Sequence, residues 1–455
     1  MNRHVLIGRL GTLDRTPVPA AADEVATQLQ LVAAKRRLDH GIGRALDDLR
    51  KLGLFPSELG LDLLVLAAHV HAADTRISRL TESQDSWTRE LRLVVPVSDP
   101  ARWAAAGPLI GRLLDFLTGD RWAIGFRARP KGFAKLVTSP AAGRRGPAFD
   151  GVALFSGGLD SLIGAIDAVE AGGKPLLVSH AGEGATSDAQ STCFATLGSH
   201  YTRQPLHRLR LWMNFPKGLV EGVGSEDTTR GRSFLFFALG IFAGTGLGRH
   251  FTLRVPENGL IALNVPLDPL RLGSLSTRTT HPFYMARWNE FLDAIGIPAR
   301  VENPYWNKTK GEMARECTNP DLLRSILPGS LSCASPTKGR WKGHGVEHCG
   351  YCLPCLIRRA AISVALGQGN DPTTYTVANL AARALDTRQA EGQQVRSFQL
   401  AASRLRARPG LAKLLIHKPG PLSDEPDRLD ELAGVYRRGL EEVGSLLARV
   451  RAEPV

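Results

Sequence analysis

A short turn rich in serine and glycine carries the clearest chemical signal in this chain of 455 residues. The apolar run 152–155 is followed by Ser156-Gly157-Gly158-Leu159-Asp160-Ser161, here called the glycine turn, and then by apolar residues at helical spacing. A strand that enters a helix through two glycines leaves backbone N–H groups unpaired at the positive helix end, and no Cβ obstructs an anion there. The pattern therefore predicts a phosphate-binding turn.

The acid within the glycine turn points to a cation. No Gly-Lys-Ser/Thr follows the turn, so it is not a Walker A motif. Asp160 would stand beside the bound phosphate, and the two anions repel each other unless a cation such as Mg²⁺ lies between them. For Gly157-Gly158 alone, an ordinary strand-to-helix turn would be a sufficient explanation. The full run of six residues after a strand favours phosphate binding.

Cysteine spacing gives the second signal. Four of the six cysteines have the spacing of metal ligands: Cys333, Cys349, Cys352 and Cys355. We predict a structural zinc, with a disulfide, a set of buried thiols or an iron–sulfur cluster as alternatives. Arg359 stands where a ferredoxin-type run would place a further cysteine, which counts against the cluster. Cys193 and Cys317 fit no ligand spacing and are predicted to be buried.

The glycine turn resembles the SGGxDS signature of the PP-loop ATP pyrophosphatases, which cleave ATP between the α and β phosphates and adenylate an oxygen. Followed downstream by Ser332-Cys333 and by Cys349-Gly350-Tyr351-Cys352-Leu353-Pro354-Cys355, it resembles the QueC family of 7-cyano-7-deazaguanine synthases. The resemblance covers roughly residues 150–365. It implies a PP-loop α/β fold, a structural zinc and ATP binding by Phe155, Ser156, Gly157, Gly158, Leu159, Asp160 and Ser161.

Further segments resemble the same family in the same order. Arg232-Ser233 opens an apolar stretch, and Thr309-Lys310-Gly311-Glu312 resembles the family's Thr-Lys-x-Glu segment. The resemblance implies that Asp160, Lys310 and Arg232 are catalytic, the two cations stabilising the pyrophosphate leaving group. Arg358 follows the last cysteine, and it could either serve the phosphates or brace the zinc lobe.

One family motif is missing. The Asp-Tyr-Ser-Gly-Tyr-Pro-Asp-Cys-Arg stretch of QueC enzymes is absent, and the region reads differently around Glu257-Asn258 and around Arg278 and His281. We predict that these four residues contact the substrate, although the first pair could be turn formers and His281 a structural partner at a helix start. With the long N-terminal region, this departure resembles QueC-like proteins of bacterial anti-phage systems, notably QatC of the Qat system.

The resemblance implies an ATP-dependent, AMP- and pyrophosphate-forming enzyme of anti-phage defence. A carboxylate, by resemblance 7-carboxy-7-deazaguanine, would be adenylated and passed to a nitrogen nucleophile. The nucleophile is ammonia in QueC, and in the defence-linked relatives it would be an amine of a partner protein encoded in the same operon. Three further interpretations stay open: synthesis of 7-cyano-7-deazaguanine (preQ0) for queuosine and deazapurine pathways, tRNA sulfur transfer through Cys193 or Cys317, and a non-catalytic nucleotide-sensing scaffold.

Composition excludes some classes of partner. The net charge is +13, but the basic residues are spread along the chain without aromatic interleaving, so specific nucleic-acid binding is not expected. No run of about 18 apolar residues occurs, and we expect no membrane span. The first residues lack the apolar core of a secretory segment, which predicts a cytoplasmic protein.

The elements expected to position these residues fall into three parts: an N-terminal α/β module (1–149) ending in a linker (129–132 and 139–147), a PP-loop domain (150–365) with a zinc lobe (333–355), and a helical C-terminal region (366–455). In the module the pattern predicts strands at 4–7, 90–96 and 122–126 and helices at 61–72 and 101–117. The clearest C-terminal helical segments are 380–385 and 429–450.

The middle part alternates between strands and helices. Strands are predicted at 152–155, 176–179, 206–212 and 251–255, and helices at 161–171, 189–202, 233–245 and 282–294. Such alternation predicts a mainly parallel sheet with helices on both faces. Its ligand should lie at the carboxyl ends of the strands, where the glycine turn and Glu257-Asn258 would meet.

Overall fold

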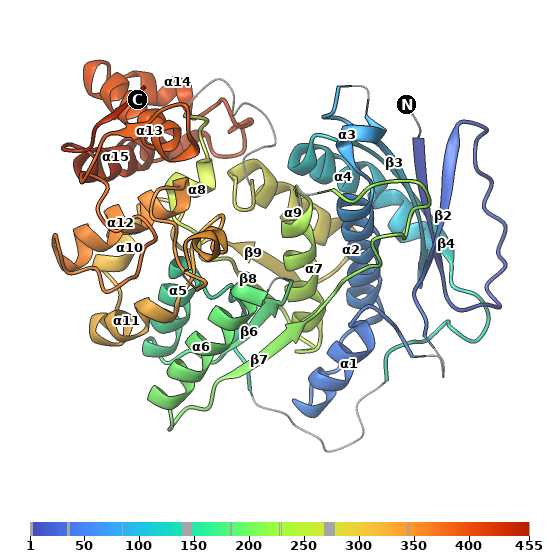
Figure 1. The fold of residues 1–455 in the computed structure, drawn as a ribbon. Helices are drawn as coiled ribbons and strands as arrows, with labels where there is room; N and C mark the ends of the chain where they lie inside the picture. The colour runs from blue at the N-terminus through green and yellow to red at the C-terminus, as the bar shows by residue number, and fades with distance from the viewer. Residues whose placement is uncertain are drawn as a thin grey trace.

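The computed structural model describes residues 3–33, 37–83, 85–138, 148–182, 184–226, 228, 230–267, 278–343 and 345–454. The chain is an α/β protein in which two parallel sheets are separated by helices (Figure 1). The predicted linker comprises 129–132 and 139–147, and its second piece lies outside the described residues. In its first piece Arg129 is buried and pairs with Glu58 and Asp62 of α2 (Glu58–Arg76), so this residue packs with the N-terminal part.

The first sheet has the order β2-β1-β3-β4, and all its neighbours are parallel. Its strands are β1 (Arg3–Arg9), β2 (Glu24–Gln30), β3 (Glu90–Val97) and β4 (Arg121–Ala128). The helices of this part are α1 (Ile42–Lys51), α2 (Glu58–Arg76), α3 (Arg79–Glu82) and α4 (Pro100–Thr118). The three strands and two helices predicted here are present, and β2, α1 and the short α3 are additional.

The second sheet has the order β7-β6-β5-β8-β9, again with parallel neighbours throughout. Its strands are β5 (Gly151–Leu154), β6 (Pro175–His180), β7 (His207–Leu211), β8 (Phe251–Arg254) and β9 (Ala299–Glu302). The chain runs outward from β5 to β7, returns, and continues outward in the other direction through β8 and β9. A doubly wound sheet of this order opens a crevice at the carboxyl ends of the two strands where the direction reverses, here β5 and β8.

Helices cover both faces of this second sheet, as the alternating pattern predicts. The four main ones are α5 (Leu159–Glu170), α6 (Gly184–His200), α7 (Arg232–Thr245) and α9 (Pro282–Ile295). Figure 1 shows α5 and α6 on one face and α7 and α9 on the other. Helix α7 is apolar all round because it lies between this sheet and α2 of the N-terminal part.

A single hydrophobic core joins the two sheets. Helix α2 is buried over almost its whole length, and one cluster contains its leucines together with Phe234, Phe237 and Phe242 of α7. Trp103 of α4 packs on Phe291 of α9 with ring centroids 6.0 Å apart. The N-terminal part therefore forms one side of the interior that supports the second sheet. The proposed domain boundaries themselves stay predictions.

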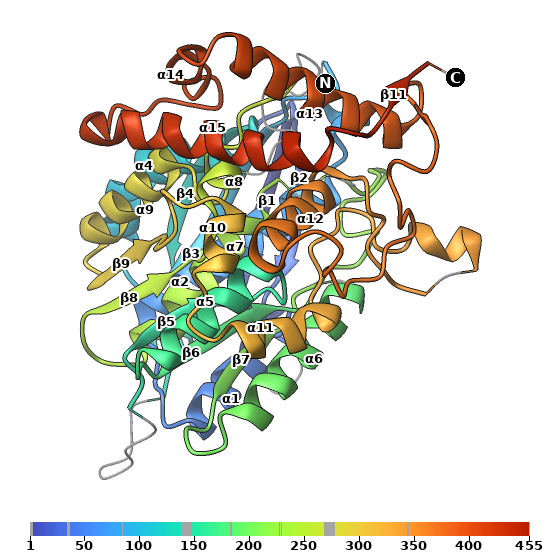
Figure 2. The ribbon, with the colours of Figure 1, turned by 90° about the vertical axis from the view of Figure 1, so that its left-hand side faces the viewer.

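The rest of the chain covers the carboxyl-end side of the second sheet. Its elements are α8 (Gly259–Leu263), α10 (Lys310–Arg315), α11 (Pro320–Ile326), η3 (Leu327–Gly329), η4 (Lys338–Lys342), α12 (Leu353–Leu366), β10 (Leu385–Asp386), α13 (Ala390–Ala407), α14 (Leu411–Leu415), η5 (Pro426–Arg428), α15 (Leu429–Leu446) and β11 (Ala452–Glu453). Figure 2 shows α13 and α15 lying across the molecule above α8 and α12. A second core packs α15 on these two helices. Among the described residues, no helix is both long and apolar enough to cross a bilayer.

Candidate functional site

The glycine turn lies at the carboxyl end of the central strand β5 and starts α5. The Ser156 and Ser161 hydroxyls are 3.0 Å apart, and the Ser161 hydroxyl oxygen accepts a hydrogen bond from the Ser156 N–H at 3.1 Å. Gly157 has φ +76°, and a Cβ there would lie 2.7 Å from the backbone nitrogen of Gln190. Both its left-handed backbone and its close approach to α6 therefore require glycine at this position.

Three backbone donors of the turn, the N–H groups of Gly157, Asp160 and Ser161, have no partner among the described residues. The N–H groups of Asp160 and Ser161 belong to the first turn of α5, which has 12 residues. The N-terminus of such a helix carries a partial positive charge. Unpaired donors at a positive helix end suit an anion such as a phosphate group.

The zinc-lobe segment holds this turn from the other side. The Leu331 N–H donates to the Gly157 carbonyl at 2.9 Å, and the Ser332 hydroxyl accepts from the Leu159 N–H at 3.2 Å. Ser332 directly precedes Cys333, the first of the four clustered cysteines. The sequence marked Ser332 only as part of a family motif, and its contact with α5 joins segments 173 residues apart.

Asp160 brings together the two segments that were expected to meet. Its Oδ2 accepts hydrogen bonds from the Asn258 side-chain amide at 2.8 Å and from the Asn258 N–H at 3.2 Å. Its Oδ1 lies 2.9 Å from the Lys310 Nζ, and both side chains of this ion pair are largely buried. The predicted meeting of the glycine turn with Glu257-Asn258 is confirmed by these contacts, and Lys310 reaches the same point from the start of α10.

Glu257 is held firmly beside this cluster. The Asn303 side-chain amide donates to the Glu257 carbonyl at 2.7 Å, and the Thr280 hydroxyl donates to the Glu257 carboxylate. Loss of solvation by burial, with a smaller contribution from the charge of Asp160, raises the pKa of Glu257 to about 7. This carboxyl can therefore both release and take up a proton near neutral pH. Thr280 and Asn303 were not predicted as site residues.

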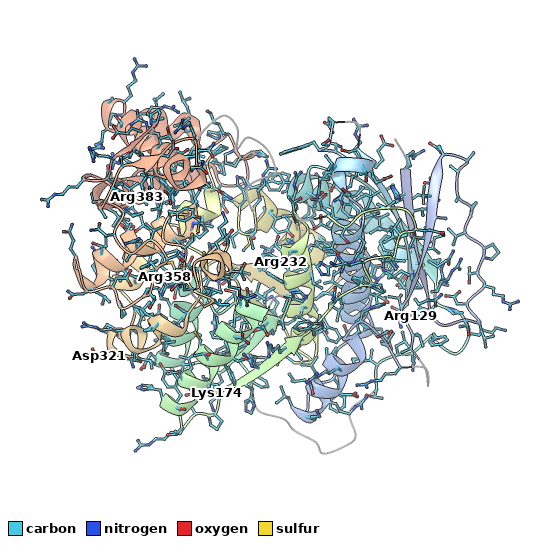
Figure 3. The ribbon with its side chains drawn as sticks, viewed as in Figure 1. Arg129, Lys174, Arg232, Asp321, Arg358 and Arg383 are labelled. Carbon is cyan, nitrogen blue, oxygen red and sulfur yellow. The ribbon has the colours of Figure 1, made fainter. Side chains whose placement is uncertain are left out.

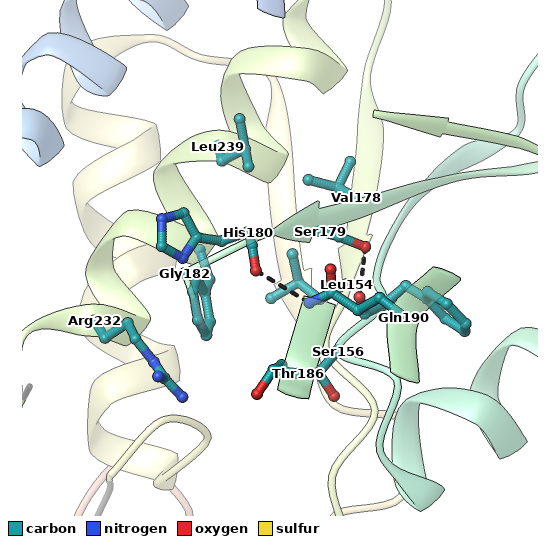
Figure 4. Close-up of a pocket in the computed structure, with 12 residues that line it drawn as sticks. Leu154, Ser156, Val178, Ser179, His180, Gly182, Thr186, Gln190, Arg232 and Leu239 are labelled. Atoms are coloured by element: carbon teal, nitrogen blue, oxygen red, sulfur yellow. Dashed lines mark hydrogen bonds between the residues drawn. The ribbon is translucent and has the colours of Figure 1, made fainter. Parts of the chain in front are cut away.

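A small pocket opens on the other side of the turn (Figure 4). It has a volume of about 60 Å³ and lies at the carboxyl ends of β5 and β6, between the first turns of α6 and α7. Val178, Phe236 and Leu239 give it apolar walls. In Figure 4 the polar ends of Arg232, Thr186 and Ser156 point toward the same side of the pocket. Arg232 is therefore at the pocket, as predicted, and Figure 3 shows it near the centre of the molecule.

Two histidines back this pocket. His180 lines it, and the ring of His71 from α2 lies 5.6 Å from the His180 ring, measured between centroids. Burial lowers the pKa of His180 to about 4, and the positive charge of Arg232 adds to this effect. Burial likewise lowers the pKa of His71 to about 3. Both rings are therefore neutral at pH 7, and the N-terminal part contributes one of them.

The remaining predicted substrate residues lie against α4. The Arg278 guanidinium donates to the Phe116 carbonyl at 2.7 Å and lies 4.7 Å from the centroid of the Phe116 ring. His281 is the N-cap of α9, where its Nδ1 accepts from the Phe283 N–H at 3.2 Å, and its ring also contacts Phe116. The structure gives these two residues packing and capping contacts, and their predicted contact with a substrate stays a prediction.

Arg358 has a structural position. Its side chain is fully buried and donates to the Ser330 hydroxyl at 2.9 Å, to the Leu327 carbonyl at 2.8 Å and to the Thr373 hydroxyl at 3.1 Å. Figure 3 shows it within the part of the molecule built by the second half of the chain. Of the two possibilities for Arg358, these contacts favour bracing of the segment that leads to the zinc lobe.

The four spaced cysteines come together in one cluster. The Sγ atoms of Cys333, Cys349, Cys352 and Cys355 all lie within 4.8 Å of one another. The Cys333–Cys352 and Cys349–Cys355 sulfur pairs are each 3.9 Å apart. A tetrahedral zinc with Zn–S bonds of about 2.3 Å has sulfur–sulfur edges of about 3.8 Å. The cluster therefore fits a structural zinc, and no disulfide links the cysteines.

Backbone groups also suit thiolates at this cluster. The N–H groups of Ser335 and Cys349 each point at the Cys333 sulfur from 3.4 Å, and the Cys352 N–H points at the Cys349 sulfur from 3.3 Å. Such donors stabilise negative charge on sulfur, which is the form that binds a metal. Gly350, with φ +89°, lets the first Cys-x-x-Cys turn close.

Comparison with known proteins adds no assignment to this geometry. No protein-family model matches the chain, and no curated protein matches it. What the site can do therefore has to be inferred from its own residues.

Proposed function

We propose that this chain is a PP-loop ATP-dependent ligase that activates a carboxylate as an acyl adenylate, releases pyrophosphate and transfers the acyl group to a nitrogen nucleophile. The observation that carries the proposal is the meeting of the glycine turn, Lys310 and the Glu257-Asn258 segment at the strand reversal of a doubly wound sheet. The resemblance to the QueC family names the acid as 7-carboxy-7-deazaguanine, and the resemblance to QatC suggests a part in anti-phage defence.

The glycine turn would hold the β and γ phosphates. Its three unpaired N–H groups and the Ser156 hydroxyl would donate to the phosphate oxygens, and Lys310 adds a positive charge beside Asp160. Arg232 approaches from the start of α7, so that positive charge stands on two sides of the developing pyrophosphate. The adenine ring would lie against Val178, Phe236 and Leu239 at the pocket of Figure 4, which would have to widen from about 60 Å³ to take it.

Asp160 has two functions in this proposal. In the structure its carboxylate is bound by Lys310 and Asn258, which fixes the start of α5 to the end of β8. The same carboxylate would also ligate the Mg²⁺ that accompanies ATP, and this ion would offset the repulsion between Asp160 and the phosphates. Lys310 would then be free to turn from the carboxylate toward a phosphate oxygen.

The proposed zinc is structural. All four protein ligands are thiols of one closed cluster, which leaves no coordination position for a substrate. Its effect on function would pass through Ser332, which precedes Cys333 and accepts a hydrogen bond from the first residue of α5.

The direct test follows the first half-reaction by itself. The purified chain, Mg²⁺, ATP and 7-carboxy-7-deazaguanine are incubated with labelled pyrophosphate, and acid-dependent return of label to ATP is measured. The proposal predicts exchange that needs the acid, and AMP release when an amine is added. Absence of both exchange and AMP, with and without co-expressed products of neighbouring genes, would contradict it.

Transfer of sulfur to tRNA is disfavoured by the two thiols outside the zinc cluster. Burial raises the pKa of Cys193 to about 12 and that of Cys317 to about 12, so neither is a thiolate near pH 7.

The product of the reaction distinguishes the enzyme from the remaining candidate functions. A nitrile would indicate synthesis of the free 7-cyano base, and an amide of a partner protein would indicate modification of that protein. A scaffold would bind ATP without turnover, and in that case Asp160→Ala would leave partner binding intact.

A further inference from the structure

A second, larger cavity lies beyond Glu257. It has a volume of about 370 Å³, opens to solvent, and is lined by the carboxyl end of β9, one face of α9 and the segment around η5. Thr280 and Asn303 line it, and these are the two residues that hold Glu257 in place. The cavity therefore adjoins the two residues that hold Glu257, and the next residue, Asn258, binds Asp160 of the glycine turn.

The charged lining of this cavity is net negative. Glu302 and Glu425 contribute carboxylates, and Arg428 is the cation among the lining residues. The Arg428 guanidinium is 3.0 Å from the Glu425 carboxylate and lies 4.6 Å from the centroid of the Trp306 ring, so its charge is already engaged. A cavity with this lining favours a cationic or hydrogen-bond-donating guest over an anion. It is therefore poorly suited to a further phosphate or carboxylate.

A hydrogen-bonded pair leads out of this cavity toward the glycine turn. The Thr280 hydroxyl donates to the Glu257 carboxylate, and Thr280 itself is almost fully buried. The neighbouring Asn258 donates to Asp160 at 2.8 Å. A group bound in the cavity can thus pass a proton to the Thr280 oxygen while Thr280 passes its own proton to Glu257.

We propose that this cavity is the acceptor site for a primary amine and that the Thr280–Glu257 pair takes the proton that the amine loses on acylation. The proposal rests on the function proposed above and names the entry site and proton acceptor for its second half-reaction. The amine can be a small molecule or an amino group of a protein chain, and ammonia offers the same nucleophilic nitrogen.

Amide formation makes one C–N bond and breaks one C–O bond. The ammonium form first loses one proton to solvent, and the free amine attacks the carbonyl carbon of the acyl adenylate, forming the C–N bond. The nitrogen then gives its extra proton to the Thr280 oxygen as the Thr280 proton moves to the Glu257 carboxylate. The bond between the carbonyl carbon and the phosphate oxygen breaks, and AMP leaves as a phosphate anion. Glu257 returns its proton to water.

The surroundings of Glu257 suit this task. Asp160 of α5 and Lys310 of α10 face it with opposite charges, and Glu302, Glu425 and Arg428 lie across the cavity. With a pKa of about 7, Glu257 is partly ionised at neutral pH and can accept a proton in each turnover.

The test separates the two half-reactions in the full chain. Acid-dependent pyrophosphate exchange reports adenylation, and amide formation with ammonium, glycinamide or Nα-acetyl-lysine reports transfer. Thr280→Val should lower the transfer rate about 100-fold, an effect of the size expected for a lost proton acceptor, with a much smaller effect on exchange. Thr280→Ser should restore most of the transfer rate, because it restores the hydroxyl.

The pH dependence of transfer tests Glu257, with a second glutamate as the control. Transfer by the wild type should rise through pH 7, and Glu257→Gln should lower it at least tenfold more than exchange and remove that rise. Glu290→Gln, on the exposed side of α9, should leave both rates and the profile unchanged. Thr280→Val and Glu257→Gln variants that transfer at the wild-type rate with the wild-type pH profile would overturn the proposal.

Filling the cavity tests the location separately. Ala286 lines it from α9, and Ala286→Phe should raise KM for glycinamide at least tenfold more than KM for ATP. Ala294→Phe, on an exposed position of the same helix, should change neither. Equal effects of the two substitutions on KM for glycinamide would refute the cavity as the amine site. A wild-type chain without exchange would instead refute the proposed function, so the two failures are distinguishable.

Discussion

Removing one zinc ligand should weaken binding of Mg–ATP at a site on another part of the chain. Cys352→Ala takes one sulfur from the cluster, and the proposed zinc would then no longer hold Cys333 in place. Two hydrogen bonds connect the residues before Cys333 to the glycine turn: Leu331 N–H to the Gly157 carbonyl, and Leu159 N–H to the Ser332 hydroxyl.

The size of the effect follows from these two bonds. A typical intramolecular hydrogen bond contributes about 0.5–1.5 kcal/mol. If both hydrogen bonds to the glycine turn are lost, the binding free energy of Mg–ATP should therefore weaken by about 1–3 kcal/mol. A coupling of that size corresponds to an increase in Kd of about 5- to 150-fold. Ser332→Ala keeps the zinc and removes one bond, and it should raise Kd roughly 2- to 12-fold.

The assay is isothermal titration of Mg–ATP into protein whose zinc content has been measured. Near-ultraviolet circular dichroism shows that each variant is folded, and Cys317→Ala serves as the control because it removes a buried thiol outside the cluster. Zinc-free Cys352→Ala that is folded and binds Mg–ATP within twofold of the wild type would refute the reasoning, as would a Ser332→Ala variant with unchanged Kd.

Three further outcomes are expected. Gly157→Ala and Gly172→Ala should each lower the free energy of unfolding in urea by about 1–2 kcal/mol, because both positions have positive φ. Gly157→Ala should lower it further, because only there would the new Cβ meet backbone atoms. Lys310→Met alone should destabilise the chain by about 3–5 kcal/mol by leaving Asp160 buried and unpaired, and in a double-mutant cycle Asp160→Asn should recover most of that loss. Between pH 4.5 and about 7 the folded chain keeps a proton on Glu257 that the unfolded chain has lost, because the pKa of Glu257 is raised in the folded state. The contribution of Glu257 to the free energy of unfolding should therefore fall as the pH rises through this range. Glu257→Gln should flatten that slope.

Local patterns were enough to predict the elements around the glycine turn. The apolar run before it and the helical spacing after it give β5 and α5 within two residues of their observed bounds, because both elements are buried and strongly patterned. Strand β9 was missed, since its four residues read Ala-Arg-Val-Glu and contain only two apolar side chains. Strand β2 was missed for a similar reason: it is an edge strand with polar residues at several positions.

The contacts within the site are harder to predict because they join distant segments. Lys310 and Asp160 are 150 positions apart, and only the family resemblance placed both among the site residues. Thr280 and Asn303 have no motif around them. The contact of Asn303 with Glu257 depends on how the ends of β8 and β9 lie side by side, and that of Thr280 depends on where α9 begins. The cluster of four cysteines was predictable because the spacing of three of them is itself local.

The N-terminal part shows the same principle at a larger scale. Its sequence carries no catalytic signature, yet Asp74 of α2 accepts a hydrogen bond at 2.7 Å from the N–H of Gly231, the residue before Arg232. Asp74 is held in turn by Arg79 and Arg89, both buried. Because an unpaired buried charge would be costly, this network keeps the start of α7 in one place. The N-terminal part therefore binds the chain directly before Arg232, and no local pattern in its sequence could have revealed that contact.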